Sequence, residues 1–407
     1  MSGNWHDRRI SPATCFDGAL GLDPAVRRAE LSGLAYRRIK PLRALAFSIL
    51  LICLAACTPR GVMVVVPPDK AEGPISTVFV GTTRGLDGAG VFSGGRSEAL
   101  RFARYDVAIP PQREVGEIRY PVPRRPNVSI DFVTTDQRIY GADADFRRDL
   151  DIALAENGRE AIIFVHGFNN TFVEGLYRIA QLRHDLELPG VALHYSWPSA
   201  AEPLGYVYDR DSALFARRGL QALIRETMAA GATRITLVAH SMGSFLTMET
   251  LRDLAQRDGG VMRQIRGVVL ISPDIDVEVF RMQAMEIGKL PQPFVIFGSD
   301  RDRVLRLSAL ITGQQGRLGS LDDVGQIGDL DVTYLDVGAF SRGSGHFVPG
   351  TSPALIRLLG RIGEVDQAFG NDAAGRTGLL PGVVLTARSA TRIILTPVAE
   401  ITGDALN

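Results

Sequence analysis

Cysteine is scarce in this sequence, and its placement excludes several kinds of site. The 407-residue chain has three cysteines, Cys15, Cys53 and Cys57, and none follows position 57. The rest of the chain can therefore form no disulfide framework, no zinc site with thiolate ligands and no cysteine nucleophile. Any covalent catalysis there has to use another nucleophile.

An excess of charge is also missing. The 45 basic and 45 acidic side chains give a formal net charge of zero, and 45% of the residues are hydrophobic. Balanced charge offers no general attraction to nucleic acid, so we expect no nucleic-acid partner. The chain also has no phosphate-binding P-loop motif. The composition is that of a globular protein, with one large α/β domain or two smaller ones.

The N-terminal region has the pattern of an export signal. Four basic side chains between positions 37 and 43 precede an apolar run of 13 residues, Ala44 to Ala56. A membrane-spanning helix needs about 20 apolar residues, so this run is short for one. The run ends in Leu-Ala-Ala-Cys, which resembles the lipobox of bacterial lipoproteins, whose cysteine becomes the lipid-modified N-terminus. We therefore expect a lipid at Cys57 that anchors the protein to a membrane of the bacterial cell envelope, on the periplasmic side. A simple membrane anchor or an uncleaved signal is the alternative.

These features divide the chain into five segments. Residues 37–57 form the expected signal peptide, and the proline- and valine-rich stretch 58–75 is expected to be a loose tether. The main domain is expected to span 76–370. The segment 1–36 is long for a region before a signal peptide, which suggests a misplaced start of translation. The tail 371–407 has no assigned role.

Short apolar runs recur along the main domain and predict the strands of one sheet. Three runs come first without long helices between them, and the later runs alternate with helical patterns. The later runs are continuously apolar, as expected for parallel strands covered on both faces. The predicted strands span residues 76–81, 105–110, 128–134, 161–167, 191–197, 234–240, 266–272, 293–298 and 331–337. The pattern favours an α/β fold, with a mostly parallel sheet and helices on both faces.

Two connections between these strands have clear helical signals. Apolar residues recur at spacings of three and four from Phe172 to Leu186, and Thr171 with Glu174 predicts a capping box at the start of that helix. The stretch between Ser272 and Pro293 has room for about one helix. We therefore expect no large lid at that point.

A serine follows the sixth predicted strand. In the stretch LVAHSMGSF, Ser241 ends the strand and opens a helix. This strand–turn–helix context is the one that a nucleophile elbow requires, and Gly243 supplies one of its small residues. Ala239, the next smallest residue, stands where the pattern G-x-S-x-G has its first glycine. A serine that simply caps a helix is the alternative interpretation.

One histidine can serve this serine as a base. In elbow-type sites the chain order is serine, acidic residue, histidine. Of the six histidines, only His346 follows Ser241, and it lies in a glycine-rich loop after the last predicted strand. A serine hydroxyl is a weak nucleophile until a base takes its proton, so we expect His346 to fill that role.

The acidic partner of the histidine should follow the predicted strand before the last one. Asp300 and Asp302 both lie there, and we prefer Asp302 because a helical pattern begins directly after it, at Arg303. Its expected role is to hold the imidazole in the correct tautomer and to stabilise the imidazolium. Asp300 stays an alternative, and Asp274 and Asp276, one strand earlier, are weaker candidates.

Two backbone amides are expected to form an oxyanion hole. Met242 follows the serine, and its N–H is one candidate donor. The sequence VHGFNN leads from the end of the strand 161–167 into the next loop and supplies Phe168 as the second donor. His166 precedes the serine in the chain, so we expect it to brace that loop rather than to act as a base.

The motifs together resemble a known family. The matching pieces are VFVGTTR, YDVAIP, FVHGFNNTF, YSWPS, YDRDSA, AHSMGS, ISPDID, SDRDRVL and a final GHF. Their order and spacing, from about Val78 to His346, are similar to those of a bacterial α/β-hydrolase family of unknown function in the esterase/lipase superfamily. The resemblance implies an α/β-hydrolase fold and a triad of Ser241, Asp302 and His346, but no particular substrate.

Two residues of the YDRDSA motif also match the family pattern. Tyr208 and Asp211 either brace the next helix, which we favour, or line the pocket. A loose glycine pattern at Gly88, Gly90 and Gly94 offers a dinucleotide site as another interpretation. We disfavour it, because the glycines come late after their strand and no βαβ unit follows.

The sequence therefore predicts a serine hydrolase. We expect a carboxylesterase that acts on short or medium acyl esters through an acyl-enzyme, with no metal and no organic cofactor. The expected partners are a small ester or acyl substrate and the membrane that holds the anchor. A non-catalytic scaffold of the same fold, or an acyltransferase or peptidase with the same triad, is the alternative.

Overall fold

The computed structural model describes residues 60–88, 90–123, 125–258, 262–313, 316–341, 343–360, 382–387 and 390–395. All of these residues belong to the unit Arg60–Asn407. The expected signal peptide, its cysteine at position 57 and the N-terminal extension 1–36 lie outside the described residues. Within the described ranges, no helix is both long enough and apolar enough to cross a bilayer.

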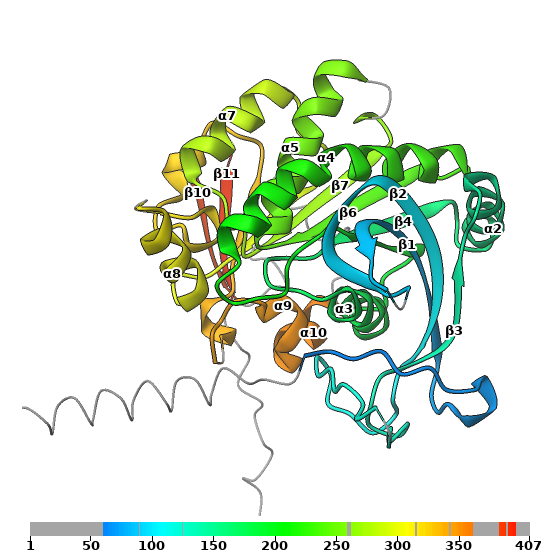
Figure 1. Cartoon of the computed structure of the whole chain (residues 1–407). Helices are drawn as coiled ribbons and strands as arrows, with labels where there is room; N and C mark the ends of the chain where they lie inside the picture. The colour runs from blue at the N-terminus through cyan, green and yellow to red at the C-terminus, as the bar shows by residue number, and fades with distance from the viewer. Residues whose placement is uncertain are drawn as a thin grey trace, which may run out of the picture. The chain divides into compact units, whose positions relative to one another are not determined.

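Eleven strands form one sheet in the described part of the chain, in the order β10-β11-β9-β8-β7-β6-β4-β5-β1-β2-β3 (Figure 1). Each strand runs parallel to its neighbour in the series β1, β5, β4, β6, β7, β8, β9 and β11. The pairs β1–β2, β2–β3 and β10–β11 are antiparallel. The strands are β1 Ile75–Leu86, β2 Phe92–Ala108, β3 Val133–Ile139, β4 Glu160–Val165, β5 Val191–Ser196, β6 Arg234–His240, β7 Ile265–Ile271, β8 Phe294–Gly298, β9 Thr333–Asp336, β10 Gly382–Ala387 and β11 Ala390–Leu395. The mostly parallel sheet confirms the predicted fold class.

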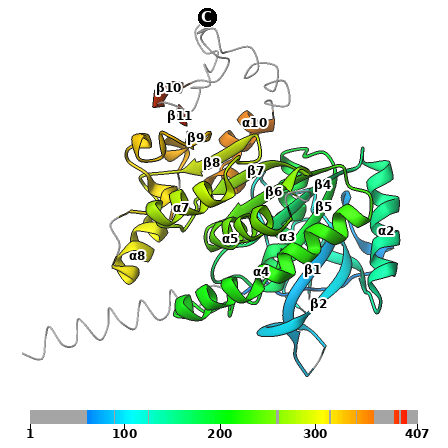
Figure 2. The same cartoon turned by 90° about the horizontal axis from the view of Figure 1, so that it is seen from above.

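Helices cover both faces of this sheet (Figures 1 and 2). Helices α2, α4, α5 and α7 contribute to one apolar core, and α3, α9 and α10 contribute to the other. The helices are η1 Pro68–Lys70, α2 Asp143–Glu156, α3 Phe172–Asp185, α4 Tyr206–Ala229, α5 Met242–Arg257, α7 Val277–Ile287, α8 Arg303–Thr312, η2 Leu318–Ser320, η3 Val324–Ile327, η4 Gly338–Phe340, α9 Val348–Thr351 and α10 Pro353–Gly360. Parallel strands joined by helices on both faces bring the carboxyl ends of the strands to one edge, where ligands bind in such folds.

Two helix predictions are confirmed in detail. The Thr171 hydroxyl accepts the Glu174 amide at 3.2 Å, and the Glu174 carboxylate accepts the Thr171 amide at 2.9 Å, which completes the capping box of α3. A single helix, α7, connects β7 to β8. This connection is therefore as short as the sequence predicts.

The two antiparallel strands β2 and β3 differ from their predicted ranges. The sequence predicts strands at 105–110 and 128–134, but β2 begins at Phe92, and β3 spans Val133–Ile139. The first half of β2 is largely solvent-exposed and polar, and only the first three residues of β3 are buried. Both segments therefore lack the apolar runs on which the prediction depended.

The stretch 60–75 is not the loose tether that the sequence predicts. The Val66 amide donates to the Thr134 carbonyl at 2.9 Å, and Val66 is buried. The Gly61 amide donates to the Glu174 carboxylate at 3.0 Å. Val64 and Val66 pack with Val133 at the start of β3, whereas Val62 and Val65 are exposed.

A hairpin extends the sheet beyond the expected end of the domain at residue 370. Strand β11 pairs in parallel with β9, and its Ile393 and Leu395 join the apolar core. The Arg392 guanidinium binds the Asp336 carboxylate of β9 at 2.5 Å. Part of the tail 371–407, which had no assigned role, is thus an edge of the sheet.

Candidate active site

Ser241 sits in a strained turn between β6 and α5. Its backbone has φ 52° and ψ −122°, a conformation that residues with a Cβ rarely adopt and that costs about 1–3 kcal/mol. The side chain makes no capping hydrogen bond to α5, although Ser241 occupies the N-cap position. Ser241 therefore lacks the contact that defines an ordinary capping serine, and its hydroxyl is not held by the helix.

Small residues allow the elbow to pack tightly. Ala239 is fully buried in the middle of the sheet, paired with β4 and β7. A Cβ on Gly243 would collide with the carbonyl oxygen of His166, because the first turn of α5 approaches the end of β4 directly. A Cβ on Gly167 would lie 2.9 Å from the Ser241 Cβ. The loop after β4 therefore rests against the serine.

Asp302 and His346 are joined by a hydrogen bond. Asp302 Oδ2 lies 2.8 Å from His346 Nδ1, with the carboxylate fully buried and the imidazole mostly buried. The other oxygen, Oδ1, accepts the amides of Val304 and Leu305 at 3.0 Å each, so Asp302 also caps α8. Hydrogen bonds on both oxygens fix this carboxylate in place.

His346 also packs against the residue before the serine. The His240 and His346 ring centroids lie 4.7 Å apart, and His240 Nε2 is 3.2 Å from the His346 carbonyl oxygen. Burial, and then the neighbouring His346, hold the pKa of His240 well below its ordinary value. His240 was not singled out from the sequence, although it stands in the AHSMGS motif directly before Ser241.

The other acidic candidates have different partners. Asp300 is exposed, and its carbonyl accepts the Arg306 side chain at 2.5 Å. Asp276 caps α7 through the amides of residues 278 and 279. Asp274 is buried, accepts the Tyr206 hydroxyl at 2.9 Å and pairs with Arg317 at 3.2 Å. Asp302 is the only one of the four whose carboxylate contacts His346 among the described residues.

The loop that carries Phe168 is braced by aromatic rings. The His166 ring stacks on Trp197, with centroids 4.8 Å apart and an interplanar angle of 11°, and both side chains are buried. The Trp197 indole donates to the His166 carbonyl at 2.7 Å. Phe168 itself packs against Tyr206 with an edge-to-face geometry. The contacts of His166 agree with the bracing role expected for it.

A buried arginine links the loops around the site. Arg84, at the end of the VFVGTTR motif, is 1% exposed, and burial lowers its pKa to about 10. Its guanidinium donates to three main-chain carbonyls, those of Ser93, Asn170 and Ser199, at 3.1, 2.8 and 2.9 Å. It thereby ties β2 to the loops after β4 and β5. The sequence shows the motif but no signal for this role, because the acceptors are main-chain atoms.

A buried aspartate braces the same loops from the other side. Asp209 accepts the Asn169 amide at 3.0 Å, the Ala200 amide at 2.6 Å and the Ser199 hydroxyl at 2.5 Å. Burial raises its pKa, and these hydrogen bonds oppose the shift. Asp209 lies within YDRDSA, where only Tyr208 and Asp211 had been considered. Its spacing from the buried residues of α4 at 212, 213 and 216 is the helical signal that could have found it.

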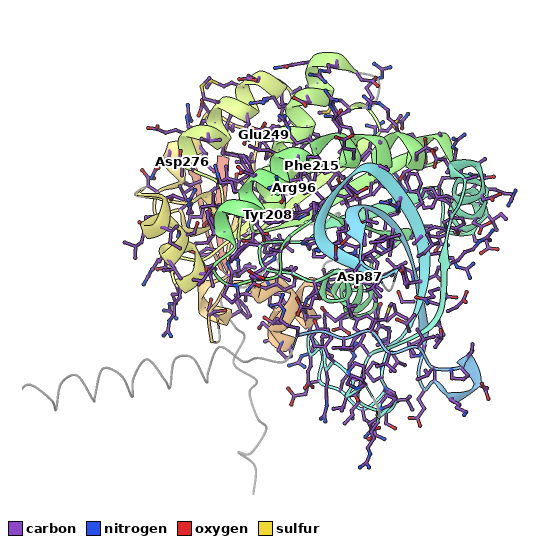
Figure 3. The ribbon with its side chains drawn as sticks, viewed as in Figure 1. Asp87, Arg96, Tyr208, Phe215, Glu249 and Asp276 are labelled. Atoms are coloured by element: carbon purple, nitrogen blue, oxygen red, sulfur yellow. The ribbon has the colours of Figure 1, made fainter. Side chains whose placement is uncertain are left out.

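Tyr208 and Asp211 lie outside this network. The Arg96 guanidinium stacks over Tyr208, 4.5 Å from the ring centroid, and Figure 3 shows Arg96 between Tyr208 and Phe215. The Tyr208 hydroxyl donates to the Gly94 carbonyl at 3.0 Å. Tyr208 therefore connects β2 to α4, in agreement with the favoured bracing role. Asp211 is exposed.

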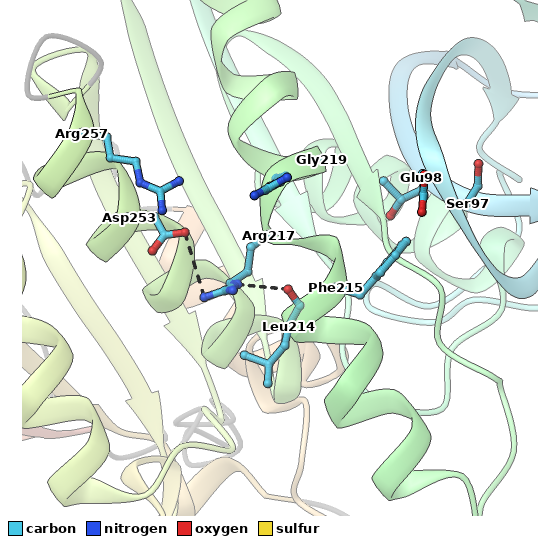
Figure 4. Close-up of a pocket in the computed structure, with 10 residues that line it drawn as sticks. Ser97, Glu98, Leu214, Phe215, Arg217, Gly219, Asp253 and Arg257 are labelled. Carbon is cyan, nitrogen blue, oxygen red and sulfur yellow. Dashed lines mark hydrogen bonds and ion pairs between the residues drawn. The ribbon is translucent and has the colours of Figure 1, made fainter.

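A hollow of about 630 Å³ lies between α4, α5 and β2, away from the serine (Figure 4). Arg217, Asp253 and Arg257 line it, and Arg217 is paired with Asp253 at 4.0 Å. Asp253 is about 16 Å along α5 from the residue after Ser241, at 1.5 Å of rise per residue. This hollow is therefore not part of the candidate site. The described residues contain no group of three or more metal-ligating side chains.

The sheet topology and the strained serine between β6 and α5 define an α/β-hydrolase fold. Residues 142–329 match a family described as "Alpha/beta hydrolase of unknown function (DUF900)". The match covers α2 to η3, including Ser241 and Asp302, and ends before His346.

Matches among solved structures come from several organisms. They include TT1662 from Thermus thermophilus, with 14% identity over 51% of this chain and 88% of that one, and a TM-score of 0.32. An alpha-beta serine hydrolase homologue from Coxiella burnetii has 12% identity over 64% and 91%, with a TM-score of 0.31. A Trichoderma reesei cutinase in complex with a phosphonate inhibitor has 14% identity over 33% and 68%, with a TM-score of 0.22. No curated protein matches the chain.

Proposed function

We propose that the protein is a serine hydrolase that cleaves carboxylic esters, with Ser241, His346 and Asp302 as its triad. The observation that carries this proposal is the 2.8 Å hydrogen bond between Asp302 and His346, together with the strained backbone of Ser241. The contact between His346 and His240 supports it further, because it puts the imidazole beside the residue that precedes Ser241.

The hydrogen bonds of His346 suit the chemistry of an acyl-enzyme. With Nδ1–H donated to Asp302, Nε2 is left to accept the proton of Ser241 as its oxygen attacks the ester carbonyl carbon. The resulting imidazolium, stabilised by the carboxylate, returns that proton to the leaving alkoxide. Water then attacks the acyl-enzyme and gives a proton to Nε2, and the imidazolium returns that proton to the serine oxygen as the carboxylic acid leaves.

The proposed oxyanion hole uses the amides of Met242 and Phe168. The Met242 N–H lies in the first turn of α5, where helical N–H groups have no partner within the helix and the helix dipole favours negative charge. Phe168 directly follows Gly167, where an added Cβ would lie 2.9 Å from the Ser241 Cβ. Two aimed amides in a site without bulk water stabilise the developing oxyanion.

A short or medium acyl chain is the proposed substrate size. Support comes from the 11-residue helix α7, which fills the connection between β7 and β8 where a larger cap would need an insertion. A series of soluble esters of increasing acyl length tests this. Faster turnover of long-chain triglycerides than of short esters would overturn it.

The membrane anchor at Cys57 stays part of the proposal, and it rests on the sequence alone. Growth with a clickable fatty acid should label the wild-type chain, and the Cys57→Ser variant should lose the label. A label that persists in Cys57→Ser would assign the lipid, or the membrane association, to another residue.

A fluorophosphonate probe tests the proposed function. Such probes react with activated serines, so the folded wild-type chain should be labelled and Ser241→Ala should not. Ser244→Ala is a matched control, because Ser244 lies one residue beyond Gly243 and binds the Ala239 carbonyl. A folded wild-type chain that takes no label would favour the non-catalytic scaffold.

A further inference from the structure

Helix α8 has an apolar outer face. It begins directly after Asp302, and Ser308 faces the interior, whereas Leu307, Leu310 and Ile311 are 57%, 79% and 56% exposed. Single exposed aliphatic side chains are common, but neighbouring ones on one helix face mark an interaction surface. We call Leu307, Leu310 and Ile311 the α8 patch.

The first turn of α4 brings further apolar groups close to this helix. The Tyr206 hydroxyl lies 3.0 Å from the Ser308 hydroxyl, and Figures 1 and 2 both show the start of α4 beside α8. On either side of Tyr206, Leu204 is 97% exposed and Val207 is 71% exposed. The apolar surface therefore extends from α8 to the neighbouring element.

Positive charge surrounds the α8 patch. Arg301, Arg303 and Arg306 are exposed, and α8 contains no acidic residue. Arg303 precedes Leu307 by four residues and Leu310 by seven, so it lies on the same helix face. The exposed acids nearest to α8 in sequence are Asp300, Asp322 and Asp323, and Glu202 and Asp211 lie near Leu204 and Val207 in the chain. Arginines beside aliphatic side chains suit a surface that offers anionic headgroups and acyl chains together.

We propose that the α8 patch docks on an anionic lipid surface, with α8 lying in the headgroup region. The cationic rim favours lipid over a second copy of the chain, whose corresponding face would bring like charges together. The docked helix starts at the carboxylate that binds His346, so the lipid surface would adjoin the site. The substrates of the proposed hydrolase would then be esters that partition into this lipid surface. Only this last step rests on the proposed function.

A tryptophan on the patch reports the contact directly. The full-length Leu310→Trp chain is mixed with vesicles of phosphatidylcholine and phosphatidylglycerol whose acyl chains are brominated. The indole should shift to shorter wavelength and be quenched, relative to the wild-type chain. Ile152→Trp is the control, because Ile152 is 57% exposed on α2, which packs on another part of the sheet. Adding Arg303→Gln to Leu310→Trp should weaken the quenching, most of all in vesicles rich in phosphatidylglycerol.

Two outcomes would overturn the docking proposal. One is an unquenched indole at position 310 in chains that sediment with the vesicles, since the chain would then be bound through another segment. The other is a blue shift that needs no vesicles and grows with protein concentration, which assigns the patch to a second copy of the chain.

A turnover measurement separates docking from catalysis. Ile311→Asp should lower turnover of an ester held in the vesicles several-fold and leave a soluble short ester unaffected. Ile152→Asp, which starts from the same residue type at nearly the same exposure, should change neither. The quenching does not need an active serine, so it should persist in Ser241→Ala. Quenching without any probe labelling of Ser241 would reject the proposed function and leave the docking in place.

Discussion

The guanidinium of Arg84 and the imidazole of His166 meet inside the protein, with Arg84 Nη2 3.3 Å from His166 Nε2. Both side chains are buried. His166 Nε2 also lies 3.0 Å from the Trp197 carbonyl oxygen, and Nδ1 lies 2.9 Å from the Gly167 carbonyl oxygen. Burial, and then the charge of Arg84, hold the pKa of His166 well below its ordinary value. The pair fixes the loop that leads to Phe168.

Removing Arg84 should therefore damage the site as well as the fold. Arg84→Met leaves three main-chain carbonyls without their donor, at about 1–3 kcal/mol for each buried group. We expect a large loss of unfolding free energy and, in the protein that still folds, a lower kcat with a smaller change in KM. Arg148→Met is the control, because Arg148 is exposed and pairs with Asp145 on the surface. Unchanged ester turnover in folded Arg84→Met would show that the loops hold their positions without it.

Asp302→Asn and Asp300→Asn should differ strongly. An asparagine oxygen can still cap α8, but its NH₂ group would face His346 Nδ1 and favour the wrong tautomer. We expect kcat to fall by about 10³–10⁴-fold in Asp302→Asn, as for other triads that lose this carboxylate. Asp300 is exposed and lacks the contact with His346, so Asp300→Asn should stay close to the wild type. The reverse order in steady-state kinetics would reassign the acid to Asp300.

The strained backbone of Ser241 predicts an order of stability. Glycine tolerates a positive φ and alanine does not, so Ser241→Gly should be more stable than Ser241→Ala by about 1 kcal/mol. Neither variant has the hydroxyl, so neither should react with a fluorophosphonate. Denaturant unfolding of the two variants measures the difference. Equal stability would mean that the elbow relaxes when the hydroxyl is absent.

His194 should make the fold sensitive to acid. Neither ring nitrogen has a hydrogen-bond partner in the described part of the chain, and burial, followed by the charge of Arg84, lowers its pKa to about 3 from the ordinary 6.5. At pH values below the ordinary pKa of 6.5, His194 binds a proton in the unfolded chain but stays neutral in the folded chain. Stability should therefore fall with decreasing pH across this window, by up to about 1.4 kcal/mol per unit for this residue.

The His194→Phe variant isolates that contribution. Its unfolding free energy should depend less on pH than that of the wild type between about pH 7 and about pH 5, whatever its absolute stability. His184→Gln is the control, because it removes a histidine that is exposed. Identical slopes for His194→Phe and the wild type would contradict a neutral, buried His194.

The parts of the molecule that follow local rules were predictable from the sequence. The parallel strands appear as apolar runs, and the capping box of α3 depends on two residues three positions apart. The proposed triad was found from chain order and from the ends of strands, which the parallel topology brings together. Asp209 and Arg84 were missed because their contacts cross between distant segments, and Arg84 binds main-chain carbonyls that carry no sequence signal. The polar half of β2 was missed for a related reason, since its pairing with β1 needs no apolar pattern.

Strand β11 has a consequence for how the protein reaches its folded state. It covers the outer edge of β9, and the loop with His346 follows β9 in the chain. During synthesis, residues 390–395 are made well after that loop, so a nascent or truncated chain would present β9 as an unprotected edge that can pair with other chains. We therefore expect shortened chains that end before β10 to aggregate more readily than the whole protein. We also expect the loop that contains His346 to reach its folded conformation only when nearly all of the chain has been made.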